Sequence, residues 1–209
     1  MHIELRRLSP DDGRDVYDML LEIPGDENGF INGCSGMSYE EYKSWLIKSD
    51  RVSQGIGLED WMVPQTIYWL YADGQPVGFG KLRHRLTDKL RLEGGHAGYS
   101  IRPSHRGKGY GKLLLGYLVE EEKALGIDRL LLTIHNDNEA SRRTAIACGG
   151  VEQGEAHQRF GAPTGHLEGV ADGQRLPVAF FRCETPRYRA EVEGMSEAHV
   201  AHCLDERRT

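Results

Sequence analysis

The stretch HAGYSIRPSHRGKGYGK, residues 96–112, decides the fold of this chain. It runs from a short apolar segment, through a basic glycine-rich turn, into a segment whose leucines have helical spacing. Gly107, Gly109 and Gly111 let the backbone adopt positive φ and approach a ligand closely. The helix that follows begins with N–H groups that lack partners, at the positive end of the helix dipole. Together with the basic side chains of the turn, these features predict a binding site for a diphosphate.

Two common phosphate-binding motifs do not fit this spacing. A Walker A loop needs four residues between its first glycine and Gly-Lys-Ser/Thr, whereas only three separate Gly107 from Gly111, and Leu113 replaces the magnesium-binding hydroxyl. The dinucleotide motif GxGxxG would require glycine in place of Lys112. The nearest acidic residue about twenty positions on, Asp128, also precedes a predicted strand instead of ending one. The spacing therefore disfavours a nucleoside triphosphate and NAD as ligands.

The pattern that does fit is R-x-x-G-x-G, which here follows a predicted strand and an Arg-Pro pair. It consists of Arg106, Gly109 and Gly111, and it resembles the acetyl-CoA loop of the GNAT superfamily of N-acetyltransferases. Further along the chain, Asn138 and Ser141 resemble the N-x-x-S segment of the same family, with two glycines after it. The order of elements is also similar to that of bacterial predicted acetyltransferases with a long loop after the first helix.

The resemblance implies acetyl-CoA as the donor, CoA as the product and a specific set of cofactor-binding residues. In the family, the pyrophosphate lies on the loop amides, the pantetheine arm pairs with the backbone of the preceding strand, and the Asn and Ser contact the cofactor. The residues of this chain at those positions are Tyr99, Ser100, Ile101, Arg106, Gly107, Lys108, Gly109, Tyr110, Gly111, Lys112, Asn138 and Ser141.

Direct attack of an amine on a thioester requires a base, because an alkyl amine is mostly protonated at neutral pH. His96 is the candidate catalytic base. It lies near the position where many family members carry a glutamate that acts through water, and an imidazole has a suitable pKa. The alternative is a histidine that is hydrogen-bonded inside the sheet, since strand alternation does not say which face it occupies.

The other catalytic groups are less clear from the sequence. Many family members carry a proton-donating tyrosine in the helix after the Asn and Ser, but Ala145 occupies that position here. Tyr110 is the candidate catalytic acid, with water or an unassisted thiolate as alternatives, and packing beside the cofactor is its other role. The backbone N–H of Ile101 is the candidate donor to the oxyanion. Cys148 has no partners at a spacing that would make it a nucleophile, so we expect it in the core.

For the acceptor, the expected partner is a small-molecule or peptide amine. Asp26, in the loop between the first two predicted helices, and Glu59, near Trp61, are the candidate substrate-binding carboxylates. That loop, residues 26–37, is either a binding lid or a plain connection. The sequence leaves the oligomeric state open, and a homodimer is one of the assemblies compatible with it.

Composition limits the other classes of function. The net charge of −6 argues against nucleic-acid binding, which depends on clustered Lys and Arg. The chain lacks a membrane-spanning apolar run and a signal-peptide pattern, so we expect a cytoplasmic location. Four cysteines without a C-x-x-C pair predict free thiols and no zinc site. A metal site at His199, His202 and Cys203 is disfavoured because no fourth ligand is evident.

Periodicity and capping patterns predict the remaining elements. Two helices are expected to begin at capping patterns, which start at Ser9 and Ser38. Further helices are predicted over 109–125 and 138–148. The predicted strands span residues 3–8, 66–71, 76–82, 95–101, 129–134 and 178–183, and an Asp-Gly turn joins the second to the third.

The resemblance implies an α/β fold with a mixed, mostly antiparallel sheet of six to seven strands and about four helices, splayed at the acetyl-CoA site. It covers residues 1–183 as one domain, is most specific over 95–151, and leaves 184–209 as a polar extension. The implied function is N-acetyl transfer from acetyl-CoA to a primary amine, by direct attack in a ternary complex. The alternative is a non-catalytic acyl-CoA-binding sensor with the same fold.

Overall fold

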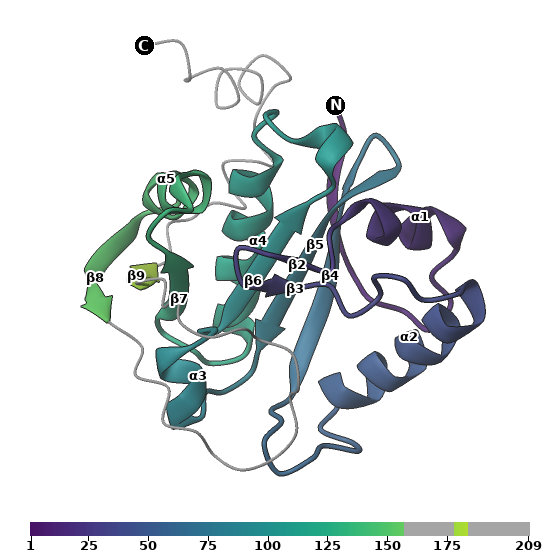
Figure 1. Ribbon diagram of the computed structural model, residues 1–209, viewed down its shortest axis with the longest axis horizontal. Helices are drawn as coiled ribbons and strands as arrows, with labels where there is room; N and C mark the ends of the chain where they lie inside the picture. Colours follow the sequence, from purple (N-terminus) through teal and green to yellow (C-terminus); the bar gives the residue numbers. More distant parts are fainter. Residues whose placement is uncertain (157–177, 184–209) are drawn as a thin grey trace, which may run out of the picture.

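The computed structural model describes residues 1–156 and 178–183 of the 209-residue chain. Helices are interspersed with single strands and strand pairs along it, and the helices lie on both faces of the β-structure (Figure 1). The α-helices of the described residues are α1 (Arg14–Glu22), α2 (Tyr39–Ser53), α3 (Asp88–Leu92), α4 (Tyr110–Ala124) and α5 (Glu139–Ala147). The strands are β1 (Ile3–Arg7), β2 (Asp26–Glu27), β3 (Phe30–Ile31), β4 (Gln65–Ala72), β5 (Gln75–Arg83), β6 (Ala97–Ile101), β7 (Leu130–His135), β8 (Gly150–Ala156) and β9 (Val178–Cys183).

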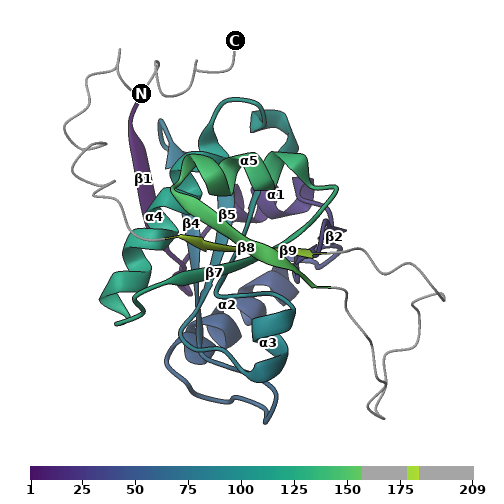
Figure 2. The ribbon, with the colours of Figure 1, turned by 90° about the vertical axis from the view of Figure 1, so that its left-hand side faces the viewer.

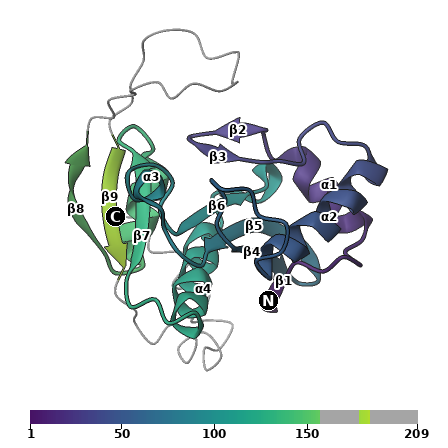
Figure 3. The ribbon, with the colours of Figure 1, turned by 90° about the horizontal axis from the view of Figure 1, so that it is seen from below.

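The strands form two antiparallel sheets and a small hairpin. The first sheet has the order β1-β4-β5-β6, the second has the order β7-β9-β8, and β2 pairs with β3. The two sheets lie side by side, with β6 next to β7 (Figure 3). This arrangement confirms the expected mixed α/β fold with a mostly antiparallel sheet.

The two faces of the first sheet bury different cores, because successive side chains of a strand point to opposite faces. Trp69 of β4 and Phe79 of β5 pack against α1 and α2. Leu70 of β4 packs on the other face against Leu114 and Leu118 of α4. Figure 3 shows α1 and α2 on one side of the sheet and α4 on the other. In Figure 2, α5 runs across the second sheet.

Two glycines in β5 bring α4 close to the sheet. A Cβ added at Gly78 would lie 2.9 Å from Ile101 Cδ1 and 3.0 Å from Leu114 Cδ2, and one at Gly80 would lie 3.1 Å from Leu114 Cδ1. A larger residue at either glycine would therefore push α4 outward. Because α4 follows the glycine-rich loop, its close packing fixes the helix N-terminus beside the end of β6.

The two sheets meet at one point and then separate. The His96 N–H donates to Leu131 O over 2.7 Å, and the Leu131 N–H donates to His96 Nδ1 over 3.0 Å. A Cβ at Gly95, where φ is +57°, would lie only 2.3 Å from Leu131 O, so only glycine fits there. Within the described ranges, β6 and β7 do not pair beyond this junction. A gap therefore opens between the two strands, which agrees with the splayed sheet that the resemblance implied.

Several predicted elements need correction. The first helix begins at Arg14, not at the Ser9 pattern, because Ser9 and Asp12 form a turn in which the Ser9 N–H donates to Asp12 Oδ2 over 2.8 Å. Trp69 Nε1–H donates to the same carboxylate oxygen over 2.7 Å, which holds that turn against the sheet. The capping box at Ser38 is confirmed. The short helix α3 and the strand β8 had no counterpart among the predicted elements.

The loop after α1 contains a hairpin that was not predicted. Its strands β2 and β3 are joined by Asn28 and Gly29, with φ of +52° and +79°. Positive φ at both central residues is typical of a tight hairpin turn. Figure 3 shows this hairpin lying over β6. The segment is therefore an ordered cover over the sheet rather than a plain connection.

Two other expectations have different outcomes. Cys148 is 3% exposed, and its thiol donates to Lys112 O over 3.4 Å, so the expected core position is confirmed. Burial raises the pKa of this thiol to about 12, which makes it a poor nucleophile.

His199, His202, Cys203 and the whole 184–209 extension lie outside the described residues. Within the ranges that the structure does describe, no cluster of metal-binding side chains is found, and no helix is long and apolar enough to cross a membrane.

Candidate acyl-CoA site

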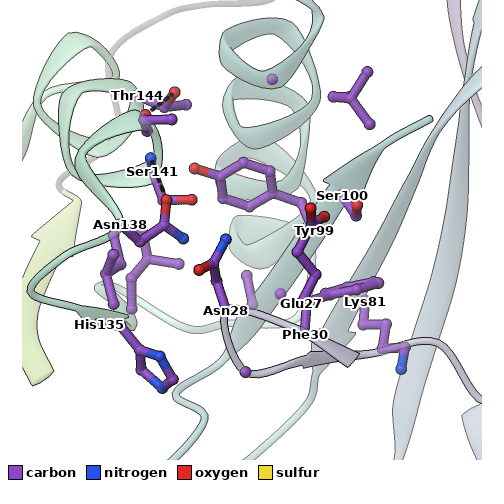
Figure 4. Close-up of a pocket in the computed structure, with 18 of the residues that line it drawn as sticks. Glu27, Asn28, Phe30, Lys81, Tyr99, Ser100, His135, Asn138, Ser141 and Thr144 are labelled. Atoms are coloured by element: carbon purple, nitrogen blue, oxygen red, sulfur yellow. Dashed lines mark hydrogen bonds between the residues drawn. The ribbon is translucent and has the colours of Figure 1, made fainter. Parts of the chain in front are cut away.

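A pocket of about 1080 Å³ extends from the glycine-rich loop along the gap between β6 and β7. One wall is β6, the opposite wall is formed by β7 and α5, and the N-terminus of α4 closes one end. The β2–β3 hairpin contributes five consecutive residues, Glu27 to Ile31, as a cover. Figure 4 shows side chains of the hairpin, β6, β7 and α5 around the same space.

The loop end of the pocket offers unpaired backbone N–H groups. Gly107 and Gly109 have φ of +77° and +81°, and Gly109 is the N-cap of α4 with no side-chain cap. Gly111 lies inside α4 instead, so its expected positive φ was wrong. The first amides of an uncapped helix bind anions well, because their dipoles point outward together.

The basic residues of the loop divide between pocket and solvent. Arg106 and Lys112 line the pocket, together with His105, whereas Lys108 does not. Desolvation and the nearby Lys108 lower the pKa of His105, which disfavours its charged form. Among the basic residues of the loop, the cationic side chains that face a ligand are therefore Arg106 and Lys112.

The wall formed by β6 presents free backbone groups to the gap. The Arg102 N–H donates to Val77 O over 3.0 Å, and the Arg83 N–H donates to His96 O over 2.8 Å, so even-numbered residues of this segment bond to β5. Neighbouring residues of an antiparallel strand point their N–H and C=O groups to opposite edges. The backbone groups of Ala97, Tyr99 and Ile101 therefore face the gap, where the Ile101 C=O accepts the Arg106 Nε–H over 2.9 Å. This edge can pair with an extended ligand that carries amides.

The opposite wall carries Asn138 and Ser141 at the start of α5. Asn138 is the N-cap, and its Oδ1 accepts the Ser141 N–H over 3.1 Å. Both residues line the pocket, with Tyr99 facing them from β6 (Figure 4). The cap uses the amide oxygen of Asn138 and leaves its amide nitrogen available as a donor.

The structure places the two candidate catalytic side chains differently. His96 does not line the pocket, and its Nδ1 is occupied by the Leu131 N–H. Burial, with Arg91 and Arg83 nearby, lowers the pKa of His96 to about 4, so the ring is neutral at neutral pH. Tyr110 lines the pocket at its loop end, but its hydroxyl donates to Met1 Sδ over 3.7 Å. A catalytic role for either residue stays a prediction.

The candidate substrate-binding carboxylates are not brought together. Asp26 is exposed on β2 and lies outside the pocket lining, as does Glu59. Glu59 Oε2 accepts the Trp61 Nε1–H over 2.8 Å, and the Trp61 side chain is 71% exposed. Carboxylates that do line the pocket are Glu27, the next residue after Asp26, and Glu93.

Contacts at several points hold the hairpin over the pocket. Arg106 donates to both carboxylate oxygens of Glu27, over 2.9 and 2.6 Å. Lys81 of β5 donates to Ile31 O, and its ammonium lies 5.0 Å from the centre of the Phe30 ring. Sequence analysis identified none of these pairs. The Asn28-Gly29 turn was the one local pattern that could have revealed the hairpin.

Comparison with known proteins agrees with this architecture. A model of the acetyltransferase (GNAT) family matches residues 34–149. The chain belongs to the GNAT family. No curated protein matches the sequence. The family model includes the glycine-rich loop, β6, α4, β7 and α5, which are the elements that build most of the pocket of this GNAT protein.

Solved structures of acetyltransferases share its fold at low identity. The yncA protein of Salmonella typhimurium, a putative acetyltransferase solved with acetyl-CoA, is 18% identical with a TM-score of 0.54, over 90% of this chain and 96% of that one. The ribosomal L7/L12 α-N-protein acetyltransferase RimL, solved with CoA, is 16% identical with a TM-score of 0.63, over 88% and 94%. A spermidine N-acetyltransferase chimera from Vibrio cholerae SpeG and hSSAT is 16% identical with a TM-score of 0.57, over 93% and 100%.

Proposed function

We propose that this protein transfers an acetyl group from acetyl-CoA to a primary amine, by direct attack in a ternary complex. The observation that carries the proposal is the pocket itself, in which an uncapped helix N-terminus and an unpaired strand edge lie along one continuous space. The first suits the pyrophosphate and the second suits the amides of the pantetheine arm. The fold and the bound ligands of the structural neighbours support the same donor.

The residues proposed to bind acetyl-CoA act through three kinds of contact. The loop amides and Arg106 hold the pyrophosphate, the β6 edge at Tyr99 and Ile101 pairs with the arm, and Asn138 donates from α5. Lys108, which does not line the pocket, adds charge at longer range. The donor would lie with its thioester near the β6–β7 junction, away from the loop.

Proton removal from the amine is proposed to proceed through water. His96 lies beside the β6–β7 junction but outside the pocket lining, with one ring nitrogen already bonded. A base with its pKa near 4 is weak at neutral pH, which favours a positioning role for His96 in holding the two sheets together. The class of amine that acts as the acceptor can be determined with a panel of substrates.

A thiol-release assay with acetyl-CoA and a panel of polyamines, amino acids, aminoglycosides and peptides tests the proposal. We expect thiol release that depends on one class of amine, and binding of CoA by calorimetry. Arg106→Ala should weaken CoA binding without changing the thermal midpoint much, whereas Arg6→Ala, which removes a surface ion pair far along β1, should leave binding unchanged. CoA binding without turnover of any amine would support the sensor alternative, and no binding of any acyl-CoA would refute both.

A further inference from the structure

Two cationic side chains of β5 line the pocket towards the β6–β7 junction, away from the glycine-rich loop. Lys81 and Arg83 are two residues apart in the strand, so their side chains lie on one face of the sheet, about 7 Å apart at the backbone. Lys81 pairs with Gly98 of β6, and the Arg83 N–H donates to His96 O. Because the thioester of the proposed donor would lie near the same junction, these cations belong to the reacting end of the pocket.

The ammonium of Lys81 lies under the hairpin, between two aromatic rings. It is 5.0 Å from the centres of the Phe30 and Phe79 rings, and it donates to Ile31 O. Figure 4 shows the side chain beside Phe30. The faces of the rings attract a cation but carry no net charge. An ammonium has three N–H donors, so Lys81 can bind an anion while it still holds the hairpin.

The guanidinium of Arg83 is engaged on one side. Its Nη1 donates to Gly94 O over 2.8 Å and to Gly95 O over 2.9 Å, which fixes the group against the turn that precedes β6. In the described part of the chain, the edge formed by Nε and Nη2 has no acceptor. Two parallel N–H groups of this kind match the two oxygens of one carboxylate.

The two cations lack a counter-charge of their own. No carboxylate among the described residues forms an ion pair with Lys81 or Arg83. Desolvation and the nearby Arg83 lower the pKa of Lys81 to about 8, and desolvation also lowers the pKa of Arg83. Glu93 lines the pocket as well, but it is one carboxylate against two cations. Buried charges of one sign are costly without an anion beside them, which indicates that a ligand supplies the anion.

The proposed donor does not bring negative charge to this place. Its pyrophosphate would lie on the loop amides, beyond Ile101, and the strand from Ala97 to Ile101 spans about 13 Å. The acetyl group at the other end of the donor is uncharged. Of the two reactants, the acceptor is therefore the one that can carry an anion to Lys81 and Arg83.

We propose that the acceptor is an amine that also carries a carboxylate, as a free amino acid does, and that Lys81 and Arg83 bind this carboxylate. The inference rests on the proposed acetyl transfer and names the class of its acceptor. Glu93 offers a carboxylate to the ammonium group of such a zwitterion. During the reaction the amine nitrogen bonds to the acetyl carbon, the carbon–sulfur bond breaks, and CoA leaves as the thiol with one proton from the amine. The carboxylate of the acceptor takes no part in the chemistry.

The same charges disfavour acceptors with several positive groups. Further ammonium groups of a polyamine or an aminoglycoside would meet Lys81 and Arg83, where like charges repel. The carboxylates that the sequence suggested for binding an ammonium, Asp26 and Glu59, do not line the pocket.

A comparison of amino acids with their carboxamides tests the proposal on the wild-type protein. Each pair has the same amine and the same side chain and differs in the negative charge. In the thiol-release assay we expect kcat/KM to be about 10- to 100-fold higher for the amino acid, as expected for charge-assisted hydrogen bonds to two cations. Dipeptides with an acidic or a neutral second residue show whether the N-terminus of an acidic peptide can supply the carboxylate instead.

Lys81→Met then assigns the preference to the pocket, because it keeps an unbranched apolar side chain and removes the charge. We expect KM for the amino acid to rise about tenfold, while kcat/KM for the carboxamide and KM for acetyl-CoA change little. Arg83→Gln should act in the same direction, and its thermal midpoint is measured as well because it also loses the bonds to Gly94 and Gly95. Arg85→Gln is the matched control, since Arg85 is exposed and outside the pocket lining.

Other outcomes separate this inference from the proposed function. Equal use of amino acids and carboxamides by the wild-type protein, or a preference for polyamines, would overturn the inference and leave acetyl transfer standing. Faster transfer from succinyl-CoA than from acetyl-CoA to an uncharged amine would also overturn it, because the cations would then serve the acyl group. Thiol release with no amine at all would refute the proposed function and the acceptor class together.

Discussion

Arg106 is paired with a protein carboxylate at the loop end of the pocket. Its guanidinium contacts both oxygens of Glu27, and its Nε–H donates to Ile101 O over 2.9 Å. A pyrophosphate at the loop must therefore share or displace Glu27. The same arginine that attracts the ligand is thus restrained by the hairpin that covers the pocket.

Replacing Glu27 with glutamine tests this competition. We expect Glu27→Gln to bind CoA about two- to fivefold more tightly, since an ion pair whose side chains are 40% and 33% exposed contributes up to about 1 kcal/mol. The gain should shrink as salt increases, because salt screens the pair in the wild-type protein. Glu4→Gln, which breaks the surface pair with Arg6, is the control and should not change affinity. Weaker binding in Glu27→Gln would mean that Glu27 helps to hold the ligand.

At this scale the sequence revealed residue types better than residue partners. Arg106 was identified because it lies in a short motif with a known spacing. Its pairing with Glu27 joins residues 79 positions apart, and no local pattern reports such a contact. The direction of His96 was also undetermined, because it depends on where the sheets separate. Periodicity gives the two faces of a strand but not what each face meets.

Among the elements, α4 makes the anion site through the backbone at its N-terminus. Gly109→Ala should cost about 1–2 kcal/mol of stability, because φ of +81° strains a residue with a Cβ, and should also weaken CoA binding strongly. Gly126→Ala is a matched control at the other end of the same helix, with φ of +72° and open space around it. It should lower the thermal midpoint similarly and leave CoA affinity unchanged. If Gly109→Ala and Gly126→Ala bind CoA with equal affinity, the loop is not part of the binding site.

The cap of α5 links helix stability to the opposite wall of the pocket. Asn138→Ala removes the acceptor for the Ser141 N–H and should destabilise the protein by about 1 kcal/mol. Asn138→Asp keeps the cap but replaces the amide donor with a carboxylate. Chemical denaturation should therefore show a stability for Asn138→Asp close to that of the wild-type protein. If the amide nitrogen contacts the cofactor, CoA binding by Asn138→Asp should nevertheless be weak. If Asn138→Asp binds CoA as tightly as the wild-type protein does, the role of Asn138 is to cap the helix.

Elements defined by local chemistry were predicted well, and those that depend on distant partners were not. The capping box at Ser38 and the Asp73-Gly74 hairpin turn are both present. The Ser9 pattern failed because Asp12 bonds to Ser9 and to Trp69 of β4 instead of beginning a helix. Strand β8 was missed because its partner among the described strands is β9, which follows about twenty residues later in the sequence.

For the molecule as a whole, the junction of the two sheets contains a buried carboxyl group. Glu122 of α4 is 2% exposed, and its Oε1 lies 3.9 Å from His96 Nδ1 without a hydrogen-bond partner in the described part of the chain. Burial raises the pKa of Glu122 to about 8, so the carboxyl is protonated in the folded protein at neutral pH. The folded state binds this proton more tightly than the unfolded state does.

Stability should therefore fall as the pH rises. The contribution of Glu122 is fully present below its unfolded pKa, near 4.5, and is lost as the pH rises through about 8. Glu122→Gln mimics the protonated form, so its thermal midpoint should change less between about pH 5 and pH 9 than that of the wild-type protein. Asp18→Asn, an exposed change on α1, is the control. The same pH dependence in Glu122→Gln and in wild type would contradict this assignment.

The fold class was predictable because one motif fixes a strand, a loop and a helix at once. Residues 96–112 determine β6 and the start of α4, and the hydrophobic pattern around them supplies the rest of the first sheet. The second sheet was less predictable, because its strand order β7-β9-β8 does not follow the sequence.

That strand order has a consequence during synthesis. Both β7 and β8 pair with β9, which is the last of the three strands to leave the ribosome. A nascent chain that ends at residue 156 contains the glycine-rich loop and α4 but lacks the strand that joins β7 to β8. Since pairing over such a sequence separation waits for the distant segment to be made, the second sheet, to which the β7 wall of the pocket belongs, is completed only after Cys183 has been translated.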